Sequence, residues 1–139
     1  MNKELKIATT IFIVVFIIDQ VVKFGFANLN WDVDGPYMSL KLAYNYGVAF
    51  SMFDGGRWFF VALTAVVLLF CILYMYKGKG QNNLWLFWSL GVIVSGAIGN
   101  LIDRIYLGYV IDFINPTFVN FAVFNIADCA VTLGTISLM

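Results

Sequence analysis

The sequence contains no histidine, and this absence excludes several kinds of active site at once. Without an imidazole there is no Ser-His or Cys-His nucleophile pair, and no zinc site of the HExxH type. The two cysteines, Cys71 and Cys129, cannot complete a four-ligand metal site, and we expect both to be small buried apolar residues. The sequence therefore predicts neither a metal centre nor a cofactor.

Charged residues are also scarce, at 12% of the 139 residues, whereas hydrophobic residues make up 62%. The 8 basic and 8 acidic side chains balance, so no basic surface indicates a nucleic-acid partner. This composition lies far outside the range of soluble domains and is typical of an integral membrane protein. The length predicts one domain that comprises residues 1–139.

Four apolar segments predict an all-α bundle of four transmembrane helices, at about 7–27, 58–76, 84–102 and 124–139. The second and third segments each have nineteen residues without a charge. Such a helix is ~28 Å long, about the thickness of one hydrocarbon core. The fourth segment falls short of the ~20 residues of a span, so we expect the sequence to end within its last helix or before a short tail.

The first segment has a second interpretation, a cleavable signal peptide. Basic residues precede it, and Gly25-Phe26-Ala27 near its end is a small-x-small cleavage pattern. Asp19 and Lys23 argue against cleavage, because a signal peptide should be apolar or weakly polar there. Their spacing of four puts both on one helical face and predicts a local ion pair in a retained helix.

Basic residues near the helix ends predict the orientation of the chain. Lys3 and Lys6 precede the first helix, and Lys77 and Lys79 lie in the 77–83 turn, so both regions should be cytoplasmic. The 28–57 and 103–125 connections then lie together on the opposite side of the membrane.

The 28–57 connection contains an alternating pattern. Apolar residues occupy the even positions from Met38 to Phe50, and mainly small or polar residues, such as Gly47 and Ala49, occupy the odd ones. A period of two is typical of strands with one apolar face. We therefore expect a small sheet within 28–57, flanked by the turn sequences DGPY and DGGR and lying on the outer membrane surface over the helices.

The third helix carries small residues at every fourth position: Gly91, Ser95 and Gly99. Such a stripe lets helix backbones approach closely in lipid. A substrate groove is the functional alternative, and close packing is the favoured interpretation.

Two aspartates, Asp112 and Asp128, interrupt apolar stretches near the two ends of the outer connection. Because both neighbouring helices end on that side, the fold can bring the carboxylates together. A close pair shares one proton, so that one member accepts a proton from water while the other donates to a peptide carbonyl. The structural alternative stays open here: each aspartate caps a helix or pairs with Arg104 or Lys23.

Four motifs carry a resemblance to a known family: DQVVK (19–23), NYGVAF (45–50), GNLIDRIYLGYVIDF (99–113) and FNIADCAV (124–131). Their order and spacing resemble those of lipoprotein signal peptidase, the type II signal peptidase of bacteria, and the resemblance covers essentially the whole chain. The early C-terminal end departs from the family pattern, in which the fourth helix is completed and a short cytoplasmic tail follows.

The resemblance implies four transmembrane helices, a β-cradle and an aspartic endopeptidase with a catalytic dyad at Asp112 and Asp128. It further implies two sets of site residues, those that bind substrate (Asn45, Arg104 and Asn125) and those that support the site (Asp19, Lys23, Gly47, Asn100 and Asp103).

The implied substrate is a prolipoprotein signal peptide in the lipid membrane, cleaved on the N-terminal side of a diacylglyceryl-modified cysteine. Globomycin is the implied inhibitor. We expect a monomer in the bacterial cytoplasmic (inner) membrane, with its N-terminus inside and its active site towards the extracytoplasmic face.

Three other functions remain as alternatives. A small proton-coupled membrane carrier also needs intramembrane carboxylates, but it predicts charges spread through the bilayer. A Ser-Lys protease would use Lys23 as its base, although contact with Asp19 would keep that lysine charged. A purely structural subunit leaves Asp112 and Asp128 unexplained.

Overall fold

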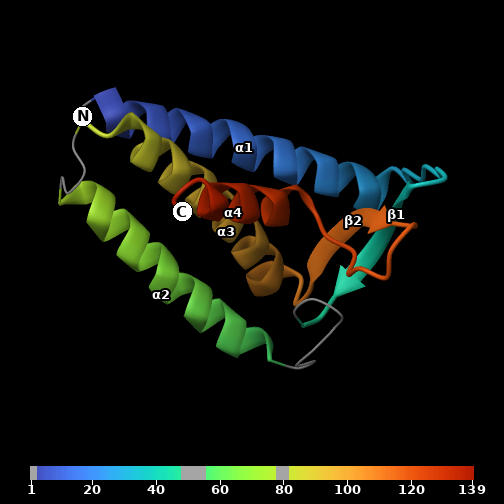
Figure 1. Cartoon of the computed structure of the whole chain (residues 1–139). Coiled ribbons are helices and arrows are strands. Elements are labelled where there is room, and N and C mark those ends of the chain that lie inside the picture. The colour runs from blue at the N-terminus through green and yellow to red at the C-terminus, as the bar shows by residue number, and fades with distance from the viewer. Residues whose placement is uncertain (1–2, 48–55, 78–81) are drawn as a thin grey trace.

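The computed structural model describes residues 3–47, 56–77 and 82–139. Its elements in chain order are α1 (Lys3–Asn28), β1 (Met38–Asn45), α2 (Arg57–Tyr76), α3 (Leu84–Tyr106), β2 (Val110–Pro116) and α4 (Ile126–Ile136). Helix α3 contacts each of the other three helices, and the two strands lie together at one end of the bundle (Figure 1). Helix α3 therefore contributes more buried residues than any other element of the described chain.

Three of the described helices, α1, α2 and α3, are long and apolar enough to cross a membrane. They match three of the predicted segments in position, and α3 continues four residues beyond its predicted end. Helix α4 has 11 residues, which is shorter than the ~20 residues of a full span. Four helices are thus present in the described chain, with three of spanning length.

Small residues on α3 allow close helix packing, as their spacing predicted. A Cβ on Gly91 would lie 2.7 Å from the carbonyl oxygen of Ala8 in α1. A Cβ on Gly99 would lie 2.6 Å from the Asp19 carboxylate. The stripe is therefore a packing surface between α3 and α1, and it allows the Asp19 side chain to lie against the α3 backbone.

The two strands form an antiparallel sheet in which Ala43 pairs with Asp112 and Asn45 with Val110. The prediction of a sheet within 28–57 is wrong for one strand, because β2 comes from the 103–125 connection. The first four residues of β2 are all buried, so this strand lacks the polar and apolar alternation that indicated β1. The predicted positions 48–50 and the first two residues of the DGGR turn, 54–55, lie outside the described residues.

Strand β1 turns part of its apolar face outward. Met38 and Tyr44 are 50% and 48% exposed, whereas Ser39 is 4% exposed. A membrane protein has apolar surroundings over much of its surface, so an outward apolar face is not penalised there as it would be in water. The opposite face of β1, which carries Ser39, can therefore point into the protein.

The α1–α3 packing is testable with Gly91→Val. The added side chain has no space against the Ala8 backbone, and overpacking typically costs about 1–3 kcal/mol. We expect a lower melting temperature in detergent than for the wild type. Ala62→Val is the matched control, because Ala62 is an exposed residue of α2. Equal melting temperatures for the two variants would contradict close packing at Gly91.

Candidate active site

Asp128 lies in the first turn of α4, where it forms a reciprocal cap with Asn125. The Asn125 side-chain oxygen accepts a hydrogen bond from the Asp128 backbone N–H (2.9 Å), and the Asp128 carboxylate accepts one from the Asn125 backbone N–H (3.1 Å). This capping box satisfies two donors that a helix start leaves free. It also holds a carboxylate at the positive end of the helix dipole.

Asp112 lies in β2, where it is 1% exposed. Its two carboxylate oxygens accept hydrogen bonds from two different side-chain amides, Asn45 at 2.9 Å and Asn125 at 2.7 Å. Asn45 is the last residue of β1 and the diagonal neighbour of Asp112 across the sheet, so the strand register brings these side chains together.

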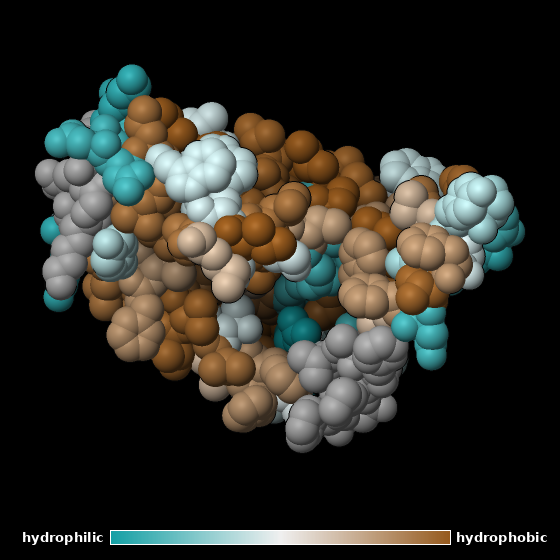
Figure 2. Space-filling model, in the orientation of Figure 1, coloured by the Kyte–Doolittle hydropathy of each residue, from teal (hydrophilic) through white to brown (hydrophobic). Residues whose placement is uncertain are grey.

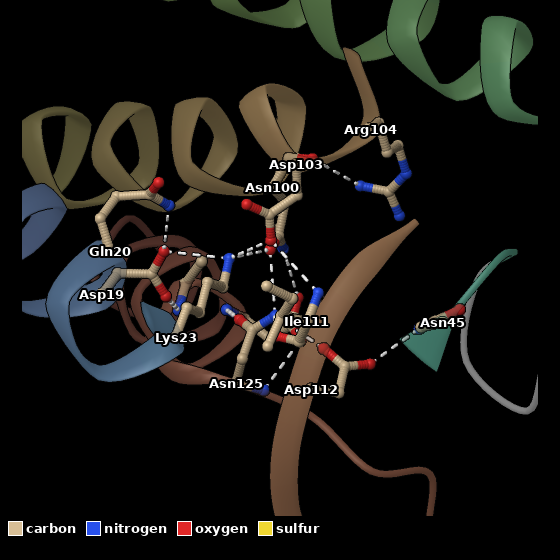
Figure 3. Close-up of polar contacts among 12 residues, drawn as sticks. Asp19, Gln20, Lys23, Asn45, Asn100, Asp103, Arg104, Ile111, Asp112 and Asn125 are labelled. Carbon is tan, nitrogen blue, oxygen red and sulfur yellow. Dashed lines mark hydrogen bonds and ion pairs between the residues drawn. The ribbon is translucent and has the colours of Figure 1, made fainter. Parts of the chain in front are cut away.

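Asn125 connects the two aspartates, and Figure 3 shows its contact with Asp112. Its side-chain nitrogen donates to Asp112, while its side-chain oxygen and backbone N–H bond to Asp128. Asn125 is fully buried, so this contact is protected from water. The two carboxylates that the sequence singled out are therefore neighbours, with one amide between them.

The environment of Asp112 favours its protonated form. Burial is the main cause and raises the pKa of Asp112 from 3.8 to about 6, and the nearby negative charge of Asp128 acts in the same direction. The hydrogen bonds from Asn45 and Asn125 and the positive charge of Lys23 lower it in part. Asp112 can therefore gain or lose a proton near neutral pH.

A buried lysine supports the site from behind. The Lys23 ammonium forms an ion pair with Asp19 at 3.0 Å, as predicted, and a second with Asp103 at 2.9 Å. It also donates to the Asn100 side-chain oxygen at 3.0 Å, and the Asn100 nitrogen donates to Asp128 at 2.7 Å. Asn100 thus connects Lys23 to the Asp128 carboxylate through two hydrogen bonds.

The acidic partners of Lys23 also hold the backbone beside each aspartate of the pair. Asp19 accepts a hydrogen bond from the backbone N–H of Ala127 (2.9 Å), and Asp103 accepts one from that of Ile111 (3.2 Å). Asp103, which the family resemblance implied as a supporting residue, is 4% exposed and part of this interior cluster.

Arg104 lies in the last turn of α3, and its guanidinium extends towards the end of β1. It donates to the carbonyl oxygen of Gly47 at 3.2 Å, and its central carbon lies 5.8 Å from the centre of the Phe60 ring in α2. Gly47 therefore contacts Arg104 through its backbone. Ala49, expected on the same face of the strand, lies outside the described residues.

A pocket of about 510 Å³ opens beside Asp128. Its lining residues are Asn45, Arg104, Phe121, Ala122, Val123, Phe124, Asp128, Cys129, Thr132 and Leu133. In Figure 2 a hydrophilic recess is bordered by apolar side chains. The pocket therefore combines a carboxylate and a guanidinium with a mainly apolar wall.

Two of the three residues expected to bind substrate, Asn45 and Arg104, line this pocket, whereas the third, Asn125, is fully buried between the aspartates. Sequence reasoning did not single out the wall formed by Phe121 and Phe124. A phenylalanine at every third position from Phe118 was the available signal, but it matches neither a helical nor a strand period.

The site offers proton exchange next to a pocket with hydrogen-bond donors. Asp112 and Asp128 are the titratable pair, and Arg104 and Asn45 can donate to oxygen atoms of a bound molecule. This is the chemistry of acid–base hydrolysis.

Comparisons with known proteins identify related proteins. The sequence profile of the family described as signal peptidase (SPase) II matches residues 11–139. A lipoprotein signal peptidase of Lactococcus lactis subsp. cremoris is 38% identical, with 96% of this chain and 91% of the relative covered. One from Streptococcus agalactiae is 44% identical over 73% of this chain and 66% of the relative. The chain thus spans just under two thirds of that second protein.

A solved structure supports the same relationship. A protein described as a bacterial membrane enzyme superimposes with a TM-score of 0.86 at 31% identity, and the match covers 94% of this chain and 84% of the other. A second structure with the same description gives a TM-score of 0.84, also at 31% identity. The likeness therefore extends through the bundle and the sheet.

The hydrogen bond from Asn45 to Asp112 gives a prediction about pH. This bond lowers the pKa of Asp112, so Asn45→Ala should raise that pKa above the wild-type value of about 6. Titration of the Asp112 carboxyl carbon by NMR in detergent micelles measures the shift. Asn115→Ala is the control, because the Asn115 amide donates to Ser39 instead of to a carboxylate. A pKa that stays constant or falls in Asn45→Ala would contradict the role of this bond.

Proposed function

Because this chain belongs to the signal peptidase II family, we propose that it removes signal peptides from prolipoproteins as an aspartic endopeptidase with Asp112 and Asp128 as its catalytic pair. One observation carries the catalytic assignment: two carboxylates from different elements, β2 and α4, share Asn125 and lie beside a pocket that Asp128 lines. Helix capping alone does not explain Asp112, which lies in a strand.

Hydrolysis requires the two carboxyl groups to hold one proton between them. The ionised member takes a proton from a water molecule as its oxygen attacks the peptide carbonyl carbon, and the protonated member donates to the carbonyl oxygen. The tetrahedral intermediate then collapses: the amide nitrogen leaves with a proton from the pair, and one hydroxyl group of the intermediate returns its proton to the pair as the carbonyl forms again. The pair ends with one proton, as it began, and needs neither metal nor histidine.

Arg104 and Asn45 would bind the peptide and the lipid-bearing residue. The Arg104 guanidinium is planar and permanently charged, so it donates hydrogen bonds to carbonyl or ester oxygens and does not exchange protons. The wall that includes Phe121, Phe124 and Leu133 would contact the apolar part of the substrate. Cleavage on the N-terminal side of a diacylglyceryl cysteine fits a pocket with both polar and apolar surfaces.

The protein is a multi-pass protein of the cytoplasmic membrane, as its family and its three spanning helices indicate. We further propose that α4 is the fourth transmembrane helix and that the sheet lies on the extracytoplasmic face. The basic residues before α1 and in the 77–83 turn support this orientation. The N-terminus would then be cytoplasmic.

The carrier alternative has no support from the related proteins. Four of the five buried charged residues in the described chain lie together at the sheet end of the bundle: Asp19, Lys23, Asp103 and Asp112. The fifth, Glu4, lies at the start of α1. A monomer suffices for the proposed reaction, because one chain supplies both aspartates. Globomycin-like inhibitors would occupy the pocket beside Asp128.

Asp112→Asn and Asp128→Asn should each abolish cleavage. Asparagine is nearly the size of aspartate but cannot exchange a proton, and loss of acid–base catalysis typically lowers rates by ~10²–10⁴-fold. The double variant should be scarcely slower than either single one, because the two groups act as a unit. The measurement is cleavage of a lipid-modified prolipoprotein by purified enzyme.

The matched control is Asp34→Asn, which removes an exposed carboxylate paired with Lys41 on the surface. It should keep wild-type activity. Asp103 is a poor control because it contacts Lys23 inside the site. If Asp128→Asn is folded, judged by its melting temperature, and still cleaves within a few-fold of wild type, the catalytic pair is wrong.

The orientation gives a separate prediction. Reporter fusions after Lys79 should be active in the cytoplasm, and fusions near Asp34 or Asn115 should be active outside it, because the basic residues are expected to remain inside. Paired reporters, one active on each side of the membrane, make the measurement. The reverse pattern would put the catalytic pair on the cytoplasmic side and refute the proposed localisation.

A further inference from the structure

Arg57, the first residue of α2, binds the end of the helix that carries Arg104. Its Nε donates to the backbone carbonyl oxygen of Arg104 and its Nη2 to that of Ile105, both at 2.6 Å. The last turn of a helix leaves its carbonyl groups without partners in the helix. The Asp103 carbonyl is already bonded to the backbone N–H groups of Leu107 and Gly108, so Arg57 satisfies the next two.

The electrostatics of this contact are favourable. The carbonyl end of α3 carries the negative pole of the helix dipole, and a cation next to it is stabilised. The guanidinium presents several N–H groups in a rigid plane, so one side chain bonds two successive carbonyls. Lysine carries its three donors on one nitrogen at the end of a flexible chain, so it lacks the planar group whose separate nitrogens bond two successive carbonyls here.

The same turn of α2 also holds the Arg104 side chain. The Phe60 ring lies 5.8 Å from the Arg104 guanidinium, within the range of a cation–π contact. Arg57 thus holds the backbone of Arg104, and Phe60 holds its side chain. On the other side the guanidinium donates to the Gly47 carbonyl oxygen.

Helix α2 otherwise makes few contacts with the rest of the described chain. Leu68 is its only buried residue, and among the described residues the helix packs mainly against α3. The hydrogen bonds of Arg57 therefore set where the first turn of α2 lies relative to α3. This is the part of α2 next to the pocket residue Arg104.

We propose that Arg57 is a positioning residue that holds Arg104 in the orientation needed to bind substrate. The proposal rests on the proposed function and assigns a role to a residue outside the predicted site. Arg57 acts through Arg104 and takes no part in proton transfer.

Arg57→Gln should raise KM by about 10-fold and leave kcat within about threefold, because it disturbs binding and leaves the aspartates in place. Arg57→Lys should recover part of the loss, since the positive charge returns without the planar group that bonds both carbonyls. Lys41→Gln is the matched control: it removes one positive charge from an exposed surface pair and should leave both constants unchanged.

A double-mutant cycle with Arg104→Lys separates positioning from general destabilisation. If Arg57 acts through Arg104, the KM increase caused by Arg57→Gln should largely disappear in the Arg104→Lys background. Equal increases in both backgrounds would overturn the proposal, as would an unchanged KM in the single variant. If Arg57→Gln does not fold, Arg57→Lys takes its place in the cycle under the same criteria.

Asp112→Asn in the same assay tests the proposed catalytic pair separately from the proposed positioning role of Arg57. An inactive Asp112→Asn together with an unaffected Arg57→Gln removes only the positioning role. An active Asp112→Asn removes the catalytic pair, and the KM cycle still reports whether Arg57 and Arg104 are coupled.

Discussion

Lys23 uses its three ammonium protons on three acceptors, Asp19, Asp103 and Asn100, and is 2% exposed. Each acceptor makes a second hydrogen bond to the segment beside an aspartate of the pair. Asp19 holds the N–H of the residue before Asp128, and Asp103 holds the N–H of the residue before Asp112. Asn100 reaches Asp128 itself. One buried cation thus fixes the positions of α4 and β2 relative to α1 and α3.

Such a cluster is stable only when every member is paired. A buried charge without a partner costs several kcal/mol, and removing one member of a buried pair is strongly destabilising. The small residues of α3 contribute here, because Gly99 leaves room for the Asp19 carboxylate against the helix backbone. The packing surface and the polar cluster are therefore parts of one arrangement, in which a larger side chain at Gly99 would displace a partner of Lys23.

The helices could be predicted from the sequence because a membrane span has a required length and composition, which α1, α2 and α3 show directly. The ion pair of Asp19 with Lys23 followed from their spacing on one helical face. Strand β2 could not be predicted in this way, because its burial removes the alternation that identifies a strand. Its pairing with β1 depends on contacts some 70 residues apart along the chain, for which a single sequence contains no local signal.

The site likewise has features that the sequence predicts and features that depend on the tertiary fold. The two aspartates could be predicted to approach each other because their segments meet at one end of the bundle. The central place of Asn125 could not, since an asparagine before a helix is equally consistent with an ordinary cap. Asn125 is in fact a cap and a bridge at once, because the residue it caps is itself one of the pair. Arg57 was read only as part of a turn sequence, and its contacts with α3 depend on the tertiary fold.

The choice of amides as the direct partners of Asp112 has a chemical consequence. Asn45 and Asn125 orient both carboxylate oxygens but supply no positive charge. Lys23 bonds to Asp19, Asp103 and Asn100 and acts on Asp112 only through its charge. A lysine or arginine in direct contact would lower the pKa of Asp112 and keep it ionised at neutral pH. Neutral donors hold the carboxylate in place while burial and the charge of Asp128 keep its pKa near 6. The pair can therefore hold one proton in common under the conditions in which it must both accept and donate one.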